Sequence, residues 1–214
     1  MNKEDNYLYK GLRKKLVEEL RNKGIKDERV LKAIESVPRH FFVASGLERL
    51  AYEDQALPIE EGQTISQPYT VAFQLELLNI EPDNKVLEIG TGSGYNAAVM
   101  CQMGAKVFSI ERISRLYKNA QYLLNSLGYK CQLFLGDGSE GKAAYAPYDR
   151  IIVTAGATDI PKPLIEQLKI GGRLVIPIGH NTQEMTLLVK HSETEVEITK
   201  HGNFVFVPLV VNKK

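Results

Sequence analysis

The 214-residue sequence has little of several features that mark specialised classes of protein. It contains only two cysteines and four histidines, and its formal net charge is only +1. No apolar run approaches the ~18 residues that a membrane-spanning helix requires. The near-neutral charge gives no general attraction to nucleic acid or another polyanion. The first residues, MNKEDNYLYKG, lack the apolar stretch of a secretory signal. We therefore expect a cytoplasmic protein without a membrane or nucleic-acid partner.

The cysteines and histidines form no recognisable disulfide or metal pattern. Cys101 and Cys131 lie in apolar surroundings, without C-x-x-C spacing and without clustered histidines. This is typical of buried thiols in a reducing compartment rather than of a disulfide or a zinc site. The histidines lack metal-ligand spacing. We predict no metal site, and we interpret the histidines as structural or surface residues: His40, His180, His191 and His201.

The chain is long enough to bury a full core, and with 43% hydrophobic and 25% charged residues it has ordinary globular composition. Its first part differs in character from the rest. Over residues 7–23 leucines recur every four positions among charged residues, which predicts an amphipathic helix. Asp27 is placed to cap a second helix, which Pro38 would stop. We predict a helical extension over residues 1–60 packed on a domain over residues 61–214, as a single structural unit.

From Lys85 onward, short apolar runs alternate with helical patterns, which is typical of βαβ units and a parallel sheet. The last two runs leave no room for a helix between them, which predicts antiparallel pairing. The sequence thus predicts an α/β fold with a doubly wound, mostly parallel seven-stranded sheet and a C-terminal antiparallel strand. The predicted strands are residues 85–89, 106–111, 131–135, 149–155, 172–178, 184–191 and 203–210. Further helices are expected over about residues 67–79, 94–103, 112–126 and 161–169.

The stretch VLEIGTGSGYNAAV places glycines between a predicted strand and a predicted helix. Glycines let the backbone turn tightly and let a ligand approach, and the free amides at a helix N-terminus favour a negative group. A dinucleotide fingerprint G-x-G-x-x-G starting at Gly90 would need glycine or alanine where this chain has Tyr95. The pattern is instead G-x-G-x-G, with Glu88 two residues before it. It disfavours a nicotinamide or flavin cofactor.

Acidic residues also follow the next two predicted strands. Glu111 lies about 20 residues after the glycines, where a carboxylate can accept both hydroxyls of a ribose. Asp137 lies between two glycines, where an adenine amino group could donate to it. Each has an ordinary structural alternative, Glu111 as an exposed acid at a helix start and Asp137 as a turn former. Because Glu88, Glu111 and Asp137 share the edge where open α/β sheets bind ligands, we predict a ligand that contains a ribose.

Several segments resemble the class I S-adenosylmethionine-dependent methyltransferases: LEIGTGSGY, SIER, GDG, YDRIIVTAGA and LKIGGRLVIPIG. More narrowly, VPRHFFV, AYEDQALPIEEGQTISQPY, VTAGA and FVPLV resemble the protein-L-isoaspartate O-methyltransferase family, over about residues 12–211. The resemblance implies S-adenosyl-L-methionine as cofactor and methylation of the free α-carboxylate of L-isoaspartyl residues, which initiates protein repair through a succinimide. The cofactor-binding residues that it implies are Glu88, Gly90, Thr91, Gly92, Glu111, Asp137 and Gly138.

The resemblance also gives a role to the polar segment GQTISQPY. A carboxylate with a pKa of about 4 is already ionised at neutral pH, so its methylation needs alignment and exclusion of water rather than a general base. The resemblance implies that Ser66 is the active-site residue, and that its hydroxyl donates to the substrate carboxylate. An alternative is that Ser66 or Gln67 only caps a helix begun by Pro68. The implied substrate-binding residues are Thr64, Ile65, Gln67, Val207 and Val210.

Three other classes of function stay open. A methyltransferase with another small-molecule or nucleic-acid acceptor would keep the glycine loop but lack GQTISQPY. A nucleotide-dependent oxidoreductase is opposed by Tyr95. A non-catalytic binding module would bind the cofactor without turnover. On the favoured interpretation, the partners are isoaspartyl-containing peptides and proteins, and we expect a monomer.

Overall fold

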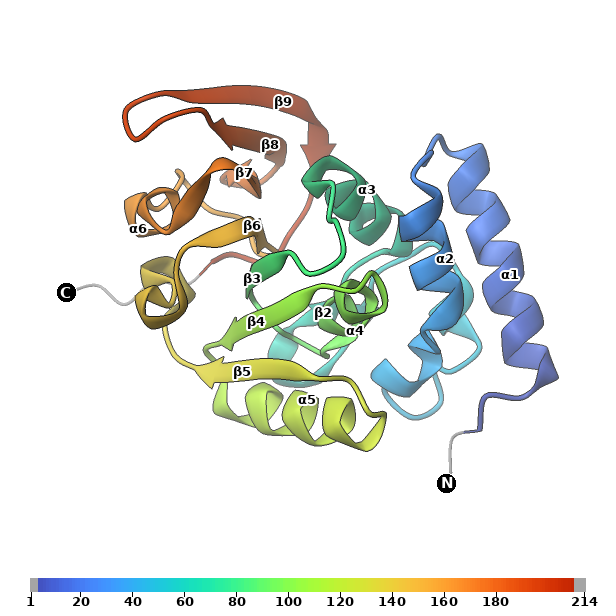
Figure 1. Cartoon of the computed structure of the whole chain (residues 1–214). Helices are drawn as coiled ribbons and strands as arrows, with labels where there is room; N and C mark the ends of the chain where they lie inside the picture. Colours follow the sequence, from blue (N-terminus) through green and yellow to red (C-terminus); the bar gives the residue numbers. More distant parts are fainter. Residues whose placement is uncertain (1–3, 210–214) are drawn as a thin grey trace.

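A sheet of seven strands forms the centre of the chain, seen in a computed structural model that describes residues 4–209 (Figure 1). Its strands are β3 (Lys85–Ile89), β4 (Lys106–Glu111), β5 (Cys131–Leu135), β6 (Tyr148–Val153), β7 (Leu168–Gly179), β8 (Gln183–Lys190) and β9 (Val196–Phe204). The strand order is β5-β4-β3-β6-β7-β8-β9. Strands β3 to β7 pair in parallel, whereas β7 with β8 and β8 with β9 pair antiparallel. The predicted mostly parallel sheet with an antiparallel edge is confirmed.

The chain changes its direction of winding at β3, because β4 lies on one side of this strand and β6 on the other. In open α/β sheets, ligands bind outside the carboxyl ends of the strands at such a switch point. Gly90 follows β3 and Thr154 follows β6, so these two residues meet at that edge. The topology therefore places the glycine loop where a ligand site is expected.

Helices cover both faces of the sheet. Val86 packs on one face with Leu75 and Val99, whereas its neighbour Leu87 packs on the opposite face with Leu164. This alternation follows from the two-residue period of a strand and produces a core on each side. The helices involved are α3 (Pro68–Leu78), α4 (Tyr95–Gln102), α5 (Ser114–Ser126) and α6 (Lys162–Glu166). All four predicted helices are present, the last one shorter because β7 already begins at Leu168.

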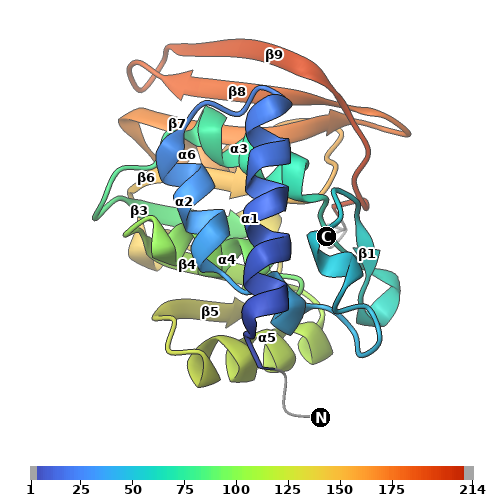
Figure 2. The same cartoon turned by 90° about the vertical axis from the view of Figure 1, so that its right-hand side faces the viewer.

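Two N-terminal helices, α1 (Tyr7–Asn22) and α2 (Glu28–Ser36), form an outer layer beside α3 and α4 (Figures 1 and 2). Their buried residues, among them Leu20 and Ile34, belong to the same hydrophobic core as α3 and α4. The Asp27 side chain accepts the backbone N–H of Arg29, so the predicted cap of the second helix is confirmed. The predicted division of the chain at residue 60 stays a prediction.

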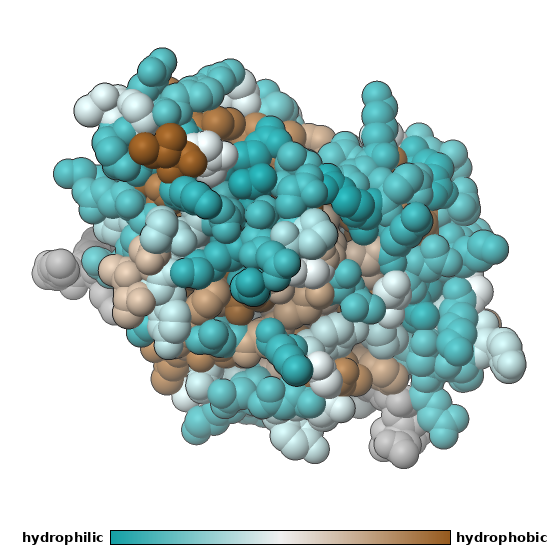
Figure 3. All heavy atoms as spheres, viewed as in Figure 1, coloured by the Kyte–Doolittle hydropathy of each residue, from teal (hydrophilic) through white to brown (hydrophobic). Residues whose placement is uncertain are grey.

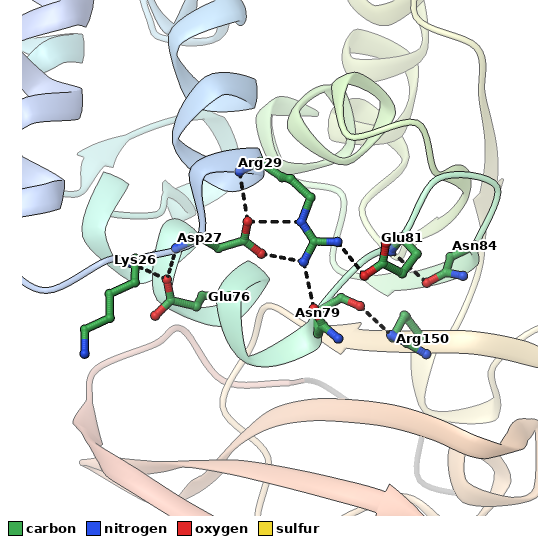
Figure 4. A network of polar contacts seen from close by, with 8 residues as sticks. All are labelled: Lys26, Asp27, Arg29, Glu76, Asn79, Glu81, Asn84 and Arg150. Carbon is green, nitrogen blue, oxygen red and sulfur yellow. Dashed lines mark hydrogen bonds and ion pairs between the residues drawn. The ribbon is translucent and has the colours of Figure 1, made fainter.

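A polar network joins α2 to α3 (Figure 4). The carboxylate of Glu76 accepts the backbone N–H groups of Lys26 and Asp27, at 2.6 and 2.7 Å. The Arg29 guanidinium donates to Asp27 and, at 2.8 Å, to the Asn79 side chain just beyond α3. The N-terminal layer is therefore fixed to the helix that follows the GQTISQPY segment.

The prediction of a last strand over residues 203–210 is wrong. The seventh strand is β9, which ends at Phe204, and beyond it Pro208 forms only an isolated bridge with Gly156. The charged sequence VEITKHGNF was not recognised as a strand because it lies at the edge of the sheet, where charges protect an exposed strand from further pairing. Pro208 has no N–H to give to a ladder. Val210 lies outside the described residues.

The surface of the face seen in Figure 3 is largely hydrophilic, and its apolar areas are interrupted by polar side chains. Among residues 4–209, no helix has both the length and the apolar character needed to cross a bilayer.

His40 is buried, stacks on Tyr9 and contacts the Tyr52 hydroxyl at 2.6 Å. Its place in the core fits the structural role predicted for it.

Candidate active site

A cavity opens at the carboxyl ends of β3, β4 and β6. Its wall contains the glycine-loop residues 90–93, Glu111 at the end of β4, Thr154 after β6 and Gly138 beyond β5. These residues come from four strand ends, of which the sequence predicted three, those of β3, β4 and β5. The cavity therefore coincides with the edge at which a ribose-containing ligand is expected.

Two glycines of this wall leave no space for a side chain. Gly90 has a φ of +96°, and a Cβ there would lie 2.5 Å from Oγ1 of Thr154. That hydroxyl donates to the carbonyl oxygen of Gly90 at 2.7 Å and so braces the turn. A Cβ on Gly138 would collide with the Ile89 side chain. Glycine at these positions lets the backbone form the cavity wall itself, which fits a ligand that lies close against the main chain.

Glu111 lines the cavity and is only 5% exposed, so it is not the exposed helix-start acid of the alternative interpretation. One carboxylate oxygen accepts the N–H of Gly92 and the other accepts the N–H of Ile113, both at 2.8 Å. A carboxylate offers about four acceptor sites, so two stay available to a ligand. The geometry fits acceptance of two ribose hydroxyls.

Glu88 lies behind the glycine loop rather than in the cavity wall. Its carboxylate accepts the Asn96 amide at 2.8 Å and the Ser109 hydroxyl at 2.5 Å, and Ser109 in turn contacts the Thr91 hydroxyl. Complete burial raises the pKa of Glu88 to about 7, with a smaller contribution from the charge of Glu111. Glu88 is therefore placed to act on a ligand through the glycine loop rather than by direct contact.

Asp137 and Gly138 were both predicted to bind the cofactor, but the structure places them differently. One Asp137 oxygen accepts both the N–H and the hydroxyl of Ser139, at 2.9 and 2.7 Å, and caps a short 3₁₀ turn. This is the turn-forming role of the structural alternative. Gly138 lines the cavity and Asp137 does not. The contact between Asp137 and adenine stays a prediction.

The GQTISQPY segment closes the cavity from the opposite side. Strand β2 (Thr64–Ile65) pairs with β1 (Leu57–Pro58), and Ser66 follows directly. Thr64, Ile65 and Ser66 line the cavity wall. No residue among 4–209 hydrogen-bonds to the Ser66 hydroxyl, which leaves this hydroxyl available to a substrate. The structure therefore brings the predicted substrate residues opposite the glycine loop.

Ser66 also lines a second cavity, which lies between α3 and the end of β9. The two cavities share the residues Thr64, Ser66, Thr154 and Val207. The first is bordered by the glycine loop and the second by the aromatic side chains of α3 and β9. Ser66 thus stands at the junction of a nucleotide-type cavity and an open groove, which is where a group passed between two substrates has to be transferred.

Arg39 holds the Ser66 loop from the N-terminal layer. Its Nη2 donates to the Ser66 carbonyl oxygen at 2.9 Å, and its guanidinium lies 4.8 Å from the centre of the Tyr95 ring. Burial lowers the pKa of Arg39 to about 10, so it stays charged at neutral pH. Tyr95 begins α4 directly after the glycines. Arg39 therefore links the loop that carries Ser66 to the helix that carries the cofactor loop.

Asp54 fixes the start of α3. One of its oxygens accepts the N–H of Tyr69 at 2.7 Å, and the other accepts the Gln67 amide and the Lys23 ammonium. Gln67 occupies the N-cap position, but its side chain makes no cap hydrogen bond. Pro68 begins the helix as predicted. The cap thus comes from Asp54, and the alternative in which Ser66 or Gln67 caps α3 is wrong.

The segment after β9 passes beside the site without forming a strand. Val207 accepts the Gly156 N–H at 2.8 Å, and Leu209 donates to the Gly156 carbonyl at 2.7 Å. The Phe206 N–H donates to the Gln183 side chain at 2.8 Å. These contacts hold Val207 in the wall of both cavities. The predicted substrate residue Val210 lies outside the described residues.

Four residues in or beside the candidate site were not identified from the sequence: Arg39, Asp54, Gln74 and Asn96. Gln74 is 1% exposed, lines the first cavity and donates to the Val153 carbonyl at 3.0 Å. It is a single amide on the apolar helix PYTVAFQLELL, which is a signal that could have identified it. Asn96 lies in the first turn after the glycines and carries a similar signal. Arg39 begins a short 3₁₀ turn and Asp54 lies in a loop. Both belong to segments that carry the family resemblance, VPRHFFV and AYEDQALPIEEGQTISQPY, but no apolar or glycine pattern marks either residue.

Comparison with known proteins gives consistent results. The family model described as "Protein-L-isoaspartate(D-aspartate) O-methyltransferase (PCMT)" matches residues 11–214. The protein-L-isoaspartate O-methyltransferase of Cytophaga hutchinsonii is 56% identical, over 97% of this chain and 94% of that protein. The protein of the same name from Christiangramia forsetii is 54% identical, over 98% of this chain and 99% of that protein.

Solved structures agree with the sequence relatives. A structure of a protein-L-isoaspartate O-methyltransferase matches with a TM-score of 0.84 and 32% identity, over 92% of this chain and 65% of that chain. A Plasmodium falciparum protein described as a protein-L-isoaspartate O-methyltransferase in complex with S-adenosyl-L-homocysteine matches with a TM-score of 0.82 and 25% identity. That match covers 94% of this chain and 99% of the Plasmodium chain.

Proposed function

The chain belongs to the protein-L-isoaspartate(D-aspartate) O-methyltransferase family, and we propose that it transfers a methyl group from S-adenosyl-L-methionine to the free α-carboxylate of L-isoaspartyl residues. Damaged peptides and proteins are then its substrates. The observation that supports the assignment of residues is the position of Ser66, which lines both the first cavity and the second one.

The first cavity has the donors and acceptors that the cofactor needs. S-adenosyl-L-methionine, when bound, supplies a methyl group on a positively charged sulfur. Glu111 would accept the ribose hydroxyls, and the backbone of Gly90, Thr91 and Gly92 would hold the methionine part. Gly138 lets the adenine approach the main chain. Glu88 acts as a positioning residue, because its hydrogen bonds reach the loop through Asn96 and Ser109.

The second cavity brings the acceptor to the same point. The Ser66 hydroxyl would donate to one oxygen of the isoaspartyl carboxylate and would leave the other oxygen to attack the methyl group that the cofactor supplies. The methyl carbon would exchange its bond to sulfur for a bond to this oxygen, with S-adenosylhomocysteine as the second product. The carboxylate is already ionised at neutral pH, so no general base takes part. Thr64, Ile65 and Val207 shape the space, and Gln67 holds the loop through its bond to Asp54.

Repair follows from the chemistry of the product. The methyl ester carries a better leaving group than the free carboxylate does, so the neighbouring amide nitrogen attacks the ester carbonyl, closes a succinimide and releases methanol. Hydrolysis of the succinimide regenerates part of the normal aspartyl linkage. The enzyme therefore needs only to methylate.

Isomeric peptides give the direct test. Labelled S-adenosyl-L-methionine is incubated with an isoaspartyl peptide and with its aspartyl twin, which has the same charge and composition. Discrimination has to come from shape, and a misplacement of about 1 Å can cost roughly 100-fold in rate. We expect label only in the isoaspartyl peptide, as an ester that is lost at mildly alkaline pH. Equal labelling of both peptides, or a base-stable label, would show that the acceptor is another group.

The remaining predictions concern the setting of the protein. We propose a monomer in the cytoplasm without a nucleic-acid partner, on the basis of the net charge of +1 and of the unbonded thiols. Sedimentation at micromolar concentration tests the monomer, and a filter-binding titration with RNA tests the nucleic-acid prediction.

A further inference from the structure

The second cavity, beside Ser66, is lined in part by aromatic side chains. We term this cavity the aromatic groove, and its volume is about 860 Å³. This lies inside the roughly 300–1,000 Å³ of typical ligand sites. Its wall comes from the start of α3 and from residues 201–207 at the end of β9. The aromatic groove is therefore large enough to accept side chains of a substrate in addition to the reacting carboxylate.

Three aromatic rings form one side of the aromatic groove. Tyr69 and Phe73 lie four residues apart on α3 and stack with ring centres 5.8 Å apart. Phe73 in turn lies 5.2 Å from the ring of Phe204. All three side chains are only half-buried. They offer apolar surface that a large apolar side chain would cover, with a favourable free energy proportional to the area removed from water.

Charged partners are missing from this wall. Among the described residues that line the aromatic groove, none is Asp, Glu, Lys or Arg. His201 is the one lining histidine, and it already contacts the Thr199 hydroxyl at 2.8 Å. A charged substrate side chain would lose water here without gaining an ion pair, which is unfavourable. The lining therefore favours apolar over charged side chains of a substrate.

The distance between Ser66 and the aromatic rings sets the position of the subsite. Phe73 lies five residues after Pro68, which corresponds to roughly 7.5 Å along the helix. An extended peptide advances about 3.3 Å per residue. A side chain two or three positions from the isoaspartyl residue therefore spans the length of helix between its start beside Ser66 and Phe73.

We propose that the aromatic groove is a subsite for an aromatic or large aliphatic side chain two or three positions from the isoaspartyl residue. The proposal rests on the proposed function, since it assumes that the peptide carboxylate is at Ser66. It adds a preference of this chain for apolar neighbours on one side of the damaged residue.

A panel of isoaspartyl peptides tests the subsite with the unmodified protein. Each peptide carries Phe, Leu, Ala, Lys or Glu at one position, two or three residues before or after the isoaspartyl residue. We expect kcat/KM for Phe to exceed that for Lys or Glu by about 10-fold to 100-fold at one of these positions, mainly through KM. Equal kcat/KM for all peptides would overturn the subsite but not the proposed function. No methylation of any peptide would overturn the function itself.

Variants locate the effect in the aromatic groove. Phe73→Ala and Phe204→Ala should bring the ratio of kcat/KM for the Phe and Lys peptides close to one. Phe134→Ala is the matched control, because Phe134 is also half-buried and lies 5.2 Å from the Tyr145 ring, outside both cavities. It should keep the ratio of the unmodified protein. A ratio that is unchanged in Phe73→Ala, or lost equally in the control, would contradict the assignment.

A second inference rests on the two cysteines, which are remote from both cavities. Cys101 lies on α4 and Cys131 begins β5, and their sulfur atoms are 3.0 Å apart. Neither cysteine forms a disulfide, and both are half-buried. The sequence indicated two separate buried thiols, and only the packing of α4 on the sheet brings them together.

We infer that this pair is a site of reversible oxidation by hydrogen peroxide. One thiol attacks the peroxide to give a sulfenic acid and water. The second thiol displaces a second water from it, forming the disulfide. Two thiols and one peroxide thus give one disulfide and two waters. The bond would close a loop between residues 30 positions apart, which restricts the unfolded chain.

Thiol titration and melting test this pair. After peroxide treatment we expect reactive thiols to fall from two to none per chain, the mass to fall by two hydrogens, and the melting temperature to rise by several degrees until dithiothreitol reverses it. The control Cys131→Ser keeps one thiol and should show no rise. Thiols that stay titratable, or disulfides that form only between chains, would overturn the inference.

Discussion

The cofactor side of the site is built from residues next to strand ends, whereas the Ser66 side is held by residues far away in the sequence. Gly90 follows β3 and Glu111 ends β4, and the parallel pairing of the two strands aligns them. The Ser66 loop depends on Arg39 and Asp54, which belong to the N-terminal loops. The two sides should therefore respond differently to substitution. The cofactor side should lose affinity, and the Ser66 side should lose rate.

Ser66→Ala gives the largest expected effect. Loss of one preorganised donor to the reacting carboxylate should lower turnover by about 10²–10³-fold. Cofactor affinity and the melting temperature should change little, because Ser66 does not cap α3 and is not one of the residues proposed to hold the cofactor. Rates, calorimetric titration and melting curves measure these effects. Ser36→Ala, which removes a hydroxyl from the far end of α2, should keep the normal rate. A normal rate in Ser66→Ala would remove Ser66 from the chemistry.

Glu88 should make stability fall as the pH rises. Burial raises its pKa in the folded protein to about 7, above the ordinary value of 4.5, so folding favours the protonated form. The stabilisation is complete below the unfolded pKa and is lost as the pH rises through the folded one. The difference amounts to ~3 kcal/mol.

Urea unfolding at pH 5 and pH 8 measures this contribution. From pH 5 to pH 8, the free energy of unfolding of the unmodified protein should decrease more than that of Glu88→Gln, which has no charge to bury. The control Glu166→Gln, which changes an exposed residue of α6, should show the same pH dependence of stability as the unmodified protein. Parallel pH curves for Glu88→Gln and the unmodified protein would mean that Glu88 does not titrate in this range.

Glu111→Gln tests the cofactor side. Loss of the charged acceptor should weaken S-adenosyl-L-methionine binding by about 1.5–3 kcal/mol, roughly 10-fold to 150-fold. Once the cofactor is saturating, the rate should recover most of its value, which is the reverse of the pattern expected for Ser66→Ala. Calorimetric titration checks the affinity, and an unchanged dissociation constant would place the ribose elsewhere.

A pair of cap variants gives the smallest expected effect. Asp54 caps α3 and Asp27 caps α2, so alanine at either position should cost about 1 kcal/mol of stability. Only Asp54→Ala should also slow methyl transfer, by about tenfold, because the Ser66 loop then loses its alignment. Equal rates in the two variants would show that the N-terminal layer supports the fold without positioning the site.

Part of the Ser66 side could also be predicted. The polar segment GQTISQPY was identified, and the cavity wall contains its Thr64, Ile65 and Ser66. Gln67 lines the aromatic groove and also donates its amide to Asp54, so its contact with the substrate stays a prediction. The edge strand β9 was misplaced, since charged residues that pair at a sheet edge carry no apolar pattern.

The sequence by itself determined the features that have a local cause. Apolar periodicity indicated the strands and helices, glycines marked the turn after β3, and acids at successive strand ends marked the cofactor edge, since parallel strands align those ends. Only the tertiary structure decided the contacts between distant residues. Arg39 meets Ser66 across 27 residues and Asp54 meets Tyr69 across 15. Such pairings depend on how the N-terminal layer packs on the sheet, and neither residue carries a local pattern that records its partner.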